Sequence, residues 1–415
     1  MRASVCVAMG LLIAGAACTK YHVAEPDGGD AKTATEAGAD VPGSGGAKGV
    51  GGAGGAAAGG AAAGGSPGTG GAAGSGTGGH IDTQTDGKNC GTVGHDCLGG
   101  PCQTGVCQPV LIAQYLRDPM AMAMGPDVVC ETSNGGLIGC AHKDGSDLQP
   151  FAYPAETANA FLGARAVIDG NRLIFAQLIA AGGFQLAICD IGNCEASSQA
   201  FGAAYTQYAA VDPVGHKVYW IDGTSVFSAS TVGTPQPAQV LFDAAGATLG
   251  APILFSRTGL LFTWAATGGN LIYRIPISTN GSSTRAASVG SGQPIATNDQ
   301  SVFWDDTDGI RSVPLPNGIG GGSNLVLAGV TGARVAVDQT SLYWTASPGV
   351  ATCTIADCAA TRRQLPPGPS TAMDVPFSTR DVVVDDTAIF WVVSTTAQPQ
   401  AGQTITSAKI FKLAK

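Results

Sequence analysis

The sequence predicts an all-β fold, a seven-bladed β-propeller, preceded by a flexible tether and a small disulfide-rich segment. Two observations carry this prediction. All five tryptophans fall in one kind of short apolar strand, at spacings of 44, 40, 40 and 47 residues. Gly, Pro, Asp and Asn divide the same part of the chain into short strands without helical periodicity. Six or eight blades are the alternatives to seven.

The repeat can be followed through residues 109–415. Stepping back from the first tryptophan by one and two periods reaches Leu173–Ala176 and Val128–Cys130, which makes seven units. Each unit has an apolar run that ends in a polar residue, then the aromatic strand, then two further strands. The tryptophan-containing strands are Val218–Trp220, Leu261–Trp264, Val302–Trp304, Leu342–Trp344 and Ile389–Trp391.

The last unit stops one strand short, while Pro109–Gln114 has the character of a fourth strand and precedes the first complete unit. We expect this segment to complete the last blade. Such pairing hides both open edges of the sheet and locks the ring.

The N-terminus is typical of an export signal. A basic Met1-Arg2 is followed by an apolar run from Val5 to Ala17 that is too short to span a bilayer comfortably. Gly15–Cys18 resembles the lipobox of bacterial lipoproteins, in which the cysteine becomes the lipidated N-terminus. We therefore predict a signal peptide over 1–18, lipidation at Cys18 and, because Thr19 follows, an outer-membrane or surface location. Secretion without lipidation is the alternative.

Residues 19–88 contain mainly Gly, Ala, Ser, Thr and Asp, with almost no large apolar side chains. Such a segment cannot offset its ordering entropy by burial, so we predict a flexible tether. Gly64–Gly68 and Gly74–Gly79 match a nucleophile elbow and a dinucleotide loop only as strings of letters. Neither has the flanking strand and helix that these motifs need.

The 12 cysteines favour disulfides. If Cys6 leaves with the signal and Cys18 is lipidated, ten remain, an even number that suits pairing in an oxidising compartment. In the segment 89–108 we predict two disulfides of open connectivity, because the zinc alternative lacks a C-x₂-C pair. Its cysteines are Cys90, Cys97, Cys102 and Cys107.

Three further disulfides are predicted within the blades. Cys130 and Cys140 flank a turn that would place them opposite each other in a hairpin. Two C-x₄-C pairs follow the third strand of their units, where each would staple the turn to the fourth strand. These pairs are Cys189 with Cys194 and Cys353 with Cys358.

The aromatic slot resembles the YWTD repeat of propellers of the low-density-lipoprotein-receptor type. The nearest matches are Tyr219–Asp222 and Tyr343–Thr345. That family has six blades and a complete Tyr-Trp-Thr-Asp tetrad, which this chain lacks. The whole layout, from lipobox through tether and Cys-rich segment to these repeats, also resembles a group of lipoproteins of Gram-negative bacteria.

An acidic residue recurs at the end of the first strand of most units. A ring of acids suits a cation or substrate in the channel, but Asp also caps its own turn, and the position opens the first turn each time. We therefore predict turn caps. The positions are Asp127, Asp169, Asp212, Asp299, Asp338 and Asp385, with Ser256 in the remaining unit.

The candidate binding residues lie between the second and third strands, where we expect longer loops on one rim. The acids of 305–308 suggest calcium by ligand type, yet they lie where a solvated turn is due. The tryptophans suit sugar stacking, but their period favours the core, with Trp264 the least regular. The candidates are Asp222, Trp264, Asp305, Asp306 and Asp308, with the polar stretch Thr395–Gln403.

Lys and Arg number 21 against 30 Asp and Glu, and this net charge of −9 argues against nucleic-acid and anionic-membrane partners. The five histidines are dispersed, and no nucleophile, base and orienting group can be named together. We expect no catalytic residues and no cofactor, with calcium as the open candidate.

The sequence thus favours a monomeric cell-envelope lipoprotein whose propeller is a non-catalytic binding or adhesion module for a glycan or a protein, in contact with the membrane only through its anchor. Two alternatives stay open. A propeller lyase or hydrolase acting on polysaccharide would show clustered carboxylates in the channel mouth. A structural or assembly lipoprotein would show an apolar face.

Overall fold

The computed structural model describes residues 81–415, within a compact unit formed by Thr77–Lys415. The predicted signal peptide, Cys18 and the tether up to residue 80 lie outside the described residues. So do the internal segments 134–136, 147–150, 153–165, 179–183, 205–207, 234–236, 245–248, 267–268, 278–283, 290–293, 316–322, 370–377 and 401–402.

Seven four-stranded antiparallel sheets, blades 1 to 7, follow one another along the chain. Blade 1 contains β4 (Pro119–Met124), β5 (Val128–Ser133), β6 (Leu137–His142) and β7 (Phe151–Ala152). Blade 2 contains β8 (Val167–Asp169), β9 (Arg172–Leu178), β10 (Phe184–Asp190) and β11 (Gln199–Ala204). Blade 3 contains β12 (Ala209–Asp212), β13 (Lys217–Asp222), β14 (Ser225–Ser230) and β15 (Gln239–Asp243).

The remaining blades repeat this order. Blade 4 contains β16 (Leu249–Ser256), β17 (Gly259–Ala266), β18 (Gly269–Ile275) and β19 (Thr284–Val289). Blade 5 contains β20 (Pro294–Thr297), β21 (Ser301–Asp306), β22 (Gly309–Pro314) and β23 (Asn324–Ala328). Blade 6 contains β24 (Val335–Val337), β25 (Ser341–Thr345), β26 (Val350–Thr354) and β27 (Arg363–Gln364). Blade 7 contains β28 (Ser378–Val384), β29 (Ala388–Gln400), β30 (Gln403–Ala414) and β3 (Val110–Tyr115).

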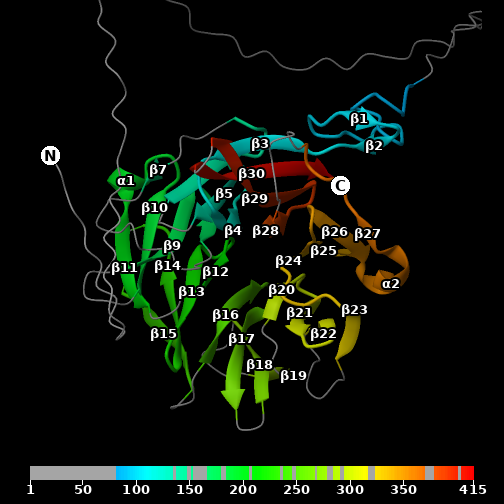
Figure 1. Cartoon of the computed structure of the whole chain (residues 1–415). Coiled ribbons are helices and arrows are strands. Elements are labelled where there is room, and N and C mark those ends of the chain that lie inside the picture. The colour runs from blue at the N-terminus through cyan, green and yellow to red at the C-terminus, as the bar shows by residue number, and fades with distance from the viewer. Residues whose placement is uncertain are drawn as a thin grey trace, which may run out of the picture. The chain divides into compact units, whose positions relative to one another are not determined.

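The first strand of each blade contacts the first strand of the next, and β28 returns to contact β4. Figure 1 shows these strands around the middle of the ring. The contacts pass through all seven blades and close, which confirms the predicted seven-bladed β-propeller.

The outer strand of blade 7 comes from the start of the propeller. Strand β3 pairs antiparallel with β30, from Val110 opposite Lys412 to Tyr115 opposite Ala408. The last blade therefore contains both ends of the propeller segment. Opening the ring between blades 7 and 1 requires this pairing to break, because only residues 116–118 separate β3 of blade 7 from β4 of blade 1 along the chain.

Four tryptophans are at most 1% exposed, which confirms that they belong to the core. They are Trp220, Trp304, Trp344 and Trp391. Trp264 lies in β17, opposite Leu249 and Leu271, but its side chain is outside the described part of the molecule. Its suggested binding role therefore remains a prediction.

Five disulfides join the ten predicted cysteines. In the Cys-rich segment Cys90 pairs with Cys102 and Cys97 with Cys107, next to a short hairpin of β1 (Cys102–Gln103) and β2 (Val106–Cys107). The Sγ atoms of Cys90, Cys97 and Cys107 lie within 4.8 Å of one another, but all are in disulfides, so none is a thiolate for zinc.

The blade disulfides also lie where the sequence predicts them. Cys130 and Cys140 face each other directly across β5 and β6. Each of the two C-x₄-C disulfides joins a third strand to the first residue of a short helix, α1 (Cys194–Ser197) in blade 2 and α2 (Cys358–Thr361) in blade 6. A 3₁₀ turn, η2 (Ile355–Asp357), precedes α2. Among the described residues, no helix has both the length and the apolar character needed to span a membrane.

Candidate binding sites

Of the acids at the ends of the first strands, Asp212, Asp338 and Asp385 cap their turns as predicted, whereas the carboxylate of Asp169 bonds to His216 and Thr231. In each of these three turns, the Oδ1 atom of the Asp accepts hydrogen bonds from the main-chain N–H groups two and three residues further along the chain, at 2.7–3.0 Å. In blade 5 this cap is Asn298, not the predicted Asp299. The prediction for Asp299 was wrong by one residue, because an Asn side-chain oxygen serves the same purpose as an Asp carboxylate.

Three acids at the ends of first strands also bond to the next blade, which the sequence did not show. Asp338 Oδ2 accepts from Lys415 Nζ of blade 7 at 2.7 Å. Asp385 Oδ2 accepts from Lys143 Nζ, just after β6 of blade 1, at 2.7 Å. Asp169 accepts from Thr231, just after β14 of blade 3. In each case the acid binds a residue at the end of the third strand of the following blade.

The ion pairs affect the ionisation of Asp338 and Asp385. Burial alone would raise the pKa of each carboxyl, but hydrogen bonds from the lysine and from the turn N–H groups outweigh burial and lower the pKa of both to about 2. Both carboxylates therefore stay charged at any ordinary pH. Ion pairs thus hold two of the interfaces between neighbouring blades, called seams below: blade 6 with blade 7, and blade 7 with blade 1.

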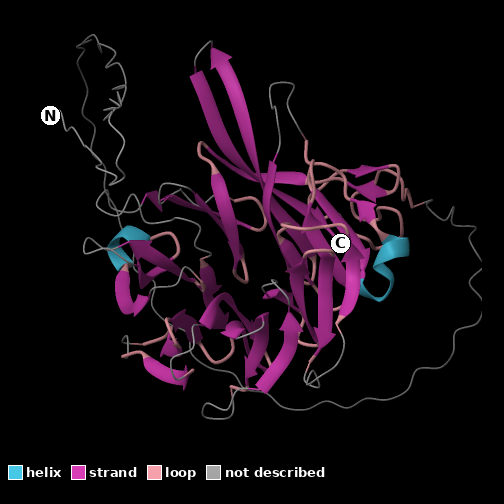
Figure 2. Ribbon diagram, turned by 60° about the horizontal axis from the view of Figure 1, so that its bottom comes forward, coloured by secondary structure: helices cyan, strands magenta, loops and turns pink. Residues whose placement is uncertain are grey.

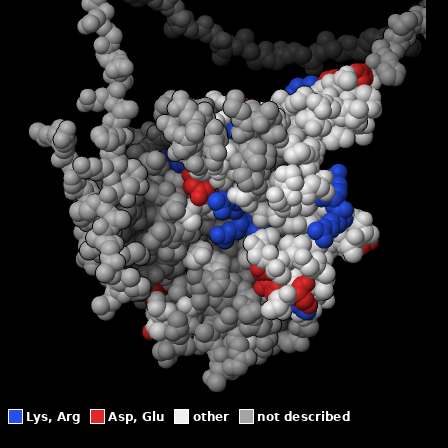
Figure 3. All heavy atoms as spheres, in the orientation of Figure 1, with Lys and Arg blue, Asp and Glu red and all other residues white. Residues whose placement is uncertain are grey.

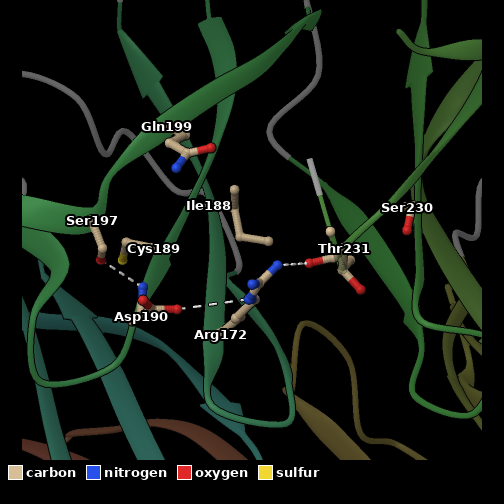
Figure 4. A pocket seen from close by; sticks show the side chains of 9 residues that line it. Arg172, Ile188, Cys189, Asp190, Ser197, Gln199, Ser230 and Thr231 are labelled. Atoms are coloured by element: carbon tan, nitrogen blue, oxygen red, sulfur yellow. Dashed lines mark hydrogen bonds and ion pairs between the residues drawn. The ribbon is translucent and has the colours of Figure 1, made fainter. Parts of the chain in front are cut away.

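A polar pocket of about 80 Å³ opens where blades 2 and 3 meet (Figure 4). Arg172 begins β9 and Asp190 ends β10, directly opposite in the strand register. Arg172 Nε lies 3.6 Å from Asp190 Oδ1, and its Nη1 donates to the carbonyl of Thr231. The lining residues are Arg172, Ile188, Cys189, Asp190, Ser197, Gln199, Ser230, Thr231 and Gly233.

The Cys189–Cys194 disulfide and helix α1, together called the staple of blade 2, position the acidic side of this pocket. Asp190 N–H donates to Ser197 Oγ at 2.8 Å, and that hydroxyl donates to Asn193 O at 2.8 Å. Cys189 and Ile188 are buried below it. The pocket thus has a rigid, disulfide-bonded wall on blade 2 and faces the end of β14 on blade 3.

His216, Asp169 and Thr231 meet beside this pocket and contain the residue types of a catalytic triad. In a triad the imidazole lies between hydroxyl and carboxylate. Here both His216 Nδ1, at 3.0 Å, and the Thr231 hydroxyl bond to the same carboxylate of Asp169. No base is placed on the hydroxyl, so the group joins two blades and does not activate a nucleophile.

A second pocket of about 270 Å³ lies in the central channel. Its walls come from the first strands of blades 1 to 4 and their connections, and the described lining has no carboxylate. The lining residues are Met122, Ala123, Met124, Ala166, Val167, Ile168, Tyr208, Ala209, Ala210, Val211, Pro252, Ile253, Leu254 and Phe255. The carboxylate cluster expected for a propeller enzyme is absent from this part of the described channel.

The predicted acids of blades 3 and 5 lie at two-residue turns: Asp222 ends β13, Asp305 and Asp306 end β21, and Asp308 is in the turn that follows. The expectation of longer loops there was therefore wrong. Asp222 pairs with Ser225, and Asp306 with Gly309, across these turns. Blade 4 separates the two turns, which therefore form no common site. Burial raises the pKa of Asp222.

The acids of blade 5 already have partners. Arg311 Nη2 lies 2.5 Å from Asp308 Oδ2, and its Nε lies 3.3 Å from Asp306 Oδ2. Asp305 points elsewhere, since its Oδ2 accepts from Gly332 N–H at 2.7 Å. A cation between these carboxylates would have to displace the arginine, so the geometry favours the turn interpretation over calcium.

The polar stretch Thr395–Gln403 is strand at its two ends, not the predicted loop. Strands β29 and β30 pair from Ala388 opposite Ala414 to Gln400 opposite Gln403. Figure 2 shows this long hairpin rising from one face of the ring. At its base the hydroxyls of Thr395 and Ser407 lie 2.6 Å apart and are buried.

The ring-closing seam contains a buried ion pair that the sequence did not reveal. Arg117, just after β3, donates to Glu131 of β5, and the two side chains are 8% and 0% exposed. Burial raises the pKa of Glu131 to about 7, although Arg117 opposes this shift. Gly139 stands opposite Glu131, and a Cβ atom there would lie within 3 Å of Arg117 and Tyr115.

A more exposed ion pair lies beside it. Arg380 Nη2 is 3.2 Å from Asp118 Oδ1, which also accepts from Ser394 Oγ at 2.7 Å. Figure 3 shows basic and acidic side chains side by side in the region of β4 and β28. These contacts join the base of the β29–β30 hairpin to blade 1.

No protein-family model matches the chain, and no curated protein matches it either. Among solved structures, a nidogen/laminin complex is 15% identical with a TM-score of 0.40, covering 59% of this chain and 94% of that one. TolB from Acinetobacter baumannii is 14% identical with a TM-score of 0.37, covering 68% of this chain and 77% of that one. BamB from Moraxella catarrhalis is 12% identical with a TM-score of 0.41 (70% and 83%). The propeller assignment rests on the strand topology and not on these likenesses.

Proposed function

We propose that this chain is a non-catalytic binding propeller of the cell envelope, anchored through Cys18, and that the β29–β30 hairpin binds an extended strand of a partner protein. The observation that carries the proposal is the pairing of the hairpin. Strand β28 pairs with β29 only as far as Ser394, and β3 pairs with β30 only as far as Ala408. Beyond these points, no described strand flanks the hairpin on either side.

The composition of the hairpin supports the same conclusion. Residues 395–407 contain no Lys, Arg, Asp or Glu. Natural sheets usually protect their free edges with charges, because unpaired N–H and C=O groups accept a further strand. Here Pro399 is the only residue of a protective type. An edge of this kind suits strand addition, in which the main chain supplies affinity and alternate side chains supply specificity.

Export and the absence of catalysis have separate support. Five disulfides favour an oxidising compartment. Among the described acids, Asp212, Asp338 and Asp385 serve as caps, and the described channel pocket is apolar. This disfavours the polysaccharide-enzyme alternative. With a net charge of −9 opposing self-association, we expect a monomer in the absence of partner.

The proposal is tested by photo-crosslinking of the full-length chain in intact bacterial cells. A photoreactive phenylalanine at position 396, in the hairpin, is compared with one at position 214, where Val214 is 86% exposed on the opposite face. We expect one discrete protein adduct from position 396 and none from 214.

A shortened variant with Asn-Gly in place of residues 396–406 provides the second arm. The purified cross-linked partner should bind the wild-type chain and lose most of its affinity for the shortened chain, whose urea midpoint should not change. Absence of an adduct from 396, an equal adduct from 214, or undiminished binding by the shortened chain would each overturn the proposal.

A further inference from the structure

We propose that the pocket between blades 2 and 3 binds the vicinal-diol edge of a neutral sugar. This goes beyond the proposed function, because the pocket lies on the face opposite the hairpin. Arg172 and Asp190 lie at the ends where the first-to-second and third-to-fourth strand connections lie, whereas the hairpin tip connects a second strand to a third.

Blade 6 has the same disulfide and short helix as blade 2 but no counterpart of the Arg172–Asp190 pair, so this local structure does not require the pair. There Ser341 and Thr354 occupy the same register positions, opposite each other and next to the cysteine of the third strand. Thr361 replaces Ser197, and the hydrogen bond from the strand end to its hydroxyl is kept at 2.9 Å. The shared disulfide, helix and hydroxyl account for the local fold, so the charged pair needs another explanation.

The pair offers the complementary groups that a diol needs. Each sugar hydroxyl both donates and accepts, the guanidinium of Arg172 only donates, and the carboxylate of Asp190 only accepts. The two side chains are 37% and 52% exposed, so a ligand can reach both. The exposed Gln199 on the rim adds one donor and one acceptor group.

The charge of the pocket favours a neutral ligand. The formal charges of Arg172 and Asp190 cancel, and the carboxylate of Asp169 lies just behind Thr231. A carboxylate or sulfate ligand would gain the arginine but face two acids within the same seam. A neutral hydroxyl pair meets no such opposition.

The size of the pocket limits what enters it. Its volume of about 80 Å³ is roughly half of the ~150 Å³ cavity that holds a benzene molecule. One edge of a single pyranose ring therefore enters, and the rest of the glycan stays outside. Ile188, in the wall of the pocket, offers an apolar contact for the ring carbons.

The test measures sugar binding to the full-length chain, purified in detergent. Neutral oligosaccharides of glucose, galactose and mannose, and an oligogalacturonate, serve as the probes on an array, followed by titration calorimetry. We expect at least one neutral probe to bind, with affinity falling at least tenfold in Arg172→Met and in the isosteric Asp190→Asn. The matched control is Arg257→Met, which removes an 86% exposed arginine paired at 3.5 Å with Asp299.

Three outcomes would overturn the inference: no neutral probe binds, only the galacturonate binds, or both variants bind as tightly as wild type. Urea unfolding of each variant verifies that the ring is intact, and Gln199→Ala, at an exposed rim position, replaces any variant that unfolds. The hairpin cross-linking result is independent, so either proposal can fail without the other.

Discussion

Blades 2 and 6 are built on the same local scaffold. In each, a C-x₄-C disulfide joins the third strand to the first residue of a four-residue helix. In each, a helix hydroxyl accepts a hydrogen bond from the N–H at the strand end: Ser197 from Asp190 at 2.8 Å, and Thr361 from Thr354 at 2.9 Å. The two scaffolds therefore hold the edge of their blades in the same way. Any difference between the seams arises from the side chains placed on them.

The seams themselves differ. Next to blade 6, Lys415 binds Asp338 and lies 5.8 Å over the ring of Tyr343. Next to blade 2, the equivalent Asp169 binds the short Thr231 side chain, and a pocket lined by Arg172 and Asp190 remains open. The Asp at the end of the first strand can therefore form an ion pair that closes the interface between two blades, or it can lie beside an open pocket. The length and charge of the residue that the next blade supplies decide between the two.

The largest effect is expected at the ring-closing seam, the most deeply buried of those that hold an ion pair. Arg117→Met should lower the free energy of unfolding by about 3–5 kcal/mol at pH 8, because it leaves the fully buried Glu131 without its cation. The loss should be smaller at pH 5, where the carboxyl is protonated. Urea unfolding at both pH values measures it.

The wild-type chain gives the matching pH dependence. Since the folded pKa of Glu131 is raised from 4.5 to about 7, its contribution is fully present below pH 4.5 and is lost as the pH rises towards 7. Glu131→Gln combined with Arg117→Met should remove this dependence. A loss in Arg117→Met that is equal at pH 5 and pH 8 would contradict the assignment.

The two staples should matter equally. Replacing both cysteines by serine, either Cys189 with Cys194 or Cys353 with Cys358, should cost about 2 kcal/mol from the loop-entropy estimate for a short loop. Urea unfolding of the two double variants gives the comparison. If one staple proves much more important than the other, the two scaffolds are not equivalent in energy.

The bonds from Lys415 to Asp338 and from Thr231 to Asp169 should differ in their contributions to the free energy of unfolding. Lys415→Met should cost about 1.5–3 kcal/mol, the range of a charged hydrogen bond, and Thr231→Val about 1 kcal/mol. The loss in Lys415→Met should depend on acid. Asp338 has a folded pKa of about 2 against 3.8, so its contribution is present above pH 3.8 and disappears as the pH falls through 2. Acid titration of the Lys415→Met variant and of the wild-type chain tests this dependence.

The smallest effect is expected when blade 2 receives the residues of blade 6. Arg172→Ser with Asp190→Thr should change stability by less than about 1 kcal/mol, because a largely exposed ion pair contributes little. Thermal unfolding measures it. A loss of several kcal/mol would instead mean that the pair is part of the scaffold, and would weaken the case for a ligand.

The sequence predicted the fold well and the sites poorly. Tryptophan spacing and short strands sufficed for seven blades, because every blade must bury the same aromatic strand between its neighbours. Among the binding candidates, the acids at 305–308 are bonded to Arg311 and Gly332, much of Thr395–Gln403 is strand, and the role of Trp264 remains a prediction. The composition of a polar stretch between two strands does not distinguish a loop from a hairpin in which the two strands simply continue.

The sequence alone favoured seven blades over six or eight, and it determined the pairing of the cysteines within the blades and the position of the closing strand, since these follow from local pattern and period. The structure decided the number of blades. Only the tertiary structure decided the pairing of Cys90, Cys97, Cys102 and Cys107, the inter-blade bonds of the acids, the Arg117–Glu131 pair and the Arg172 pocket. Those contacts join residues on different strands or different blades, and their partners depend on how the ring places the strand ends in space, which no spacing along the chain records.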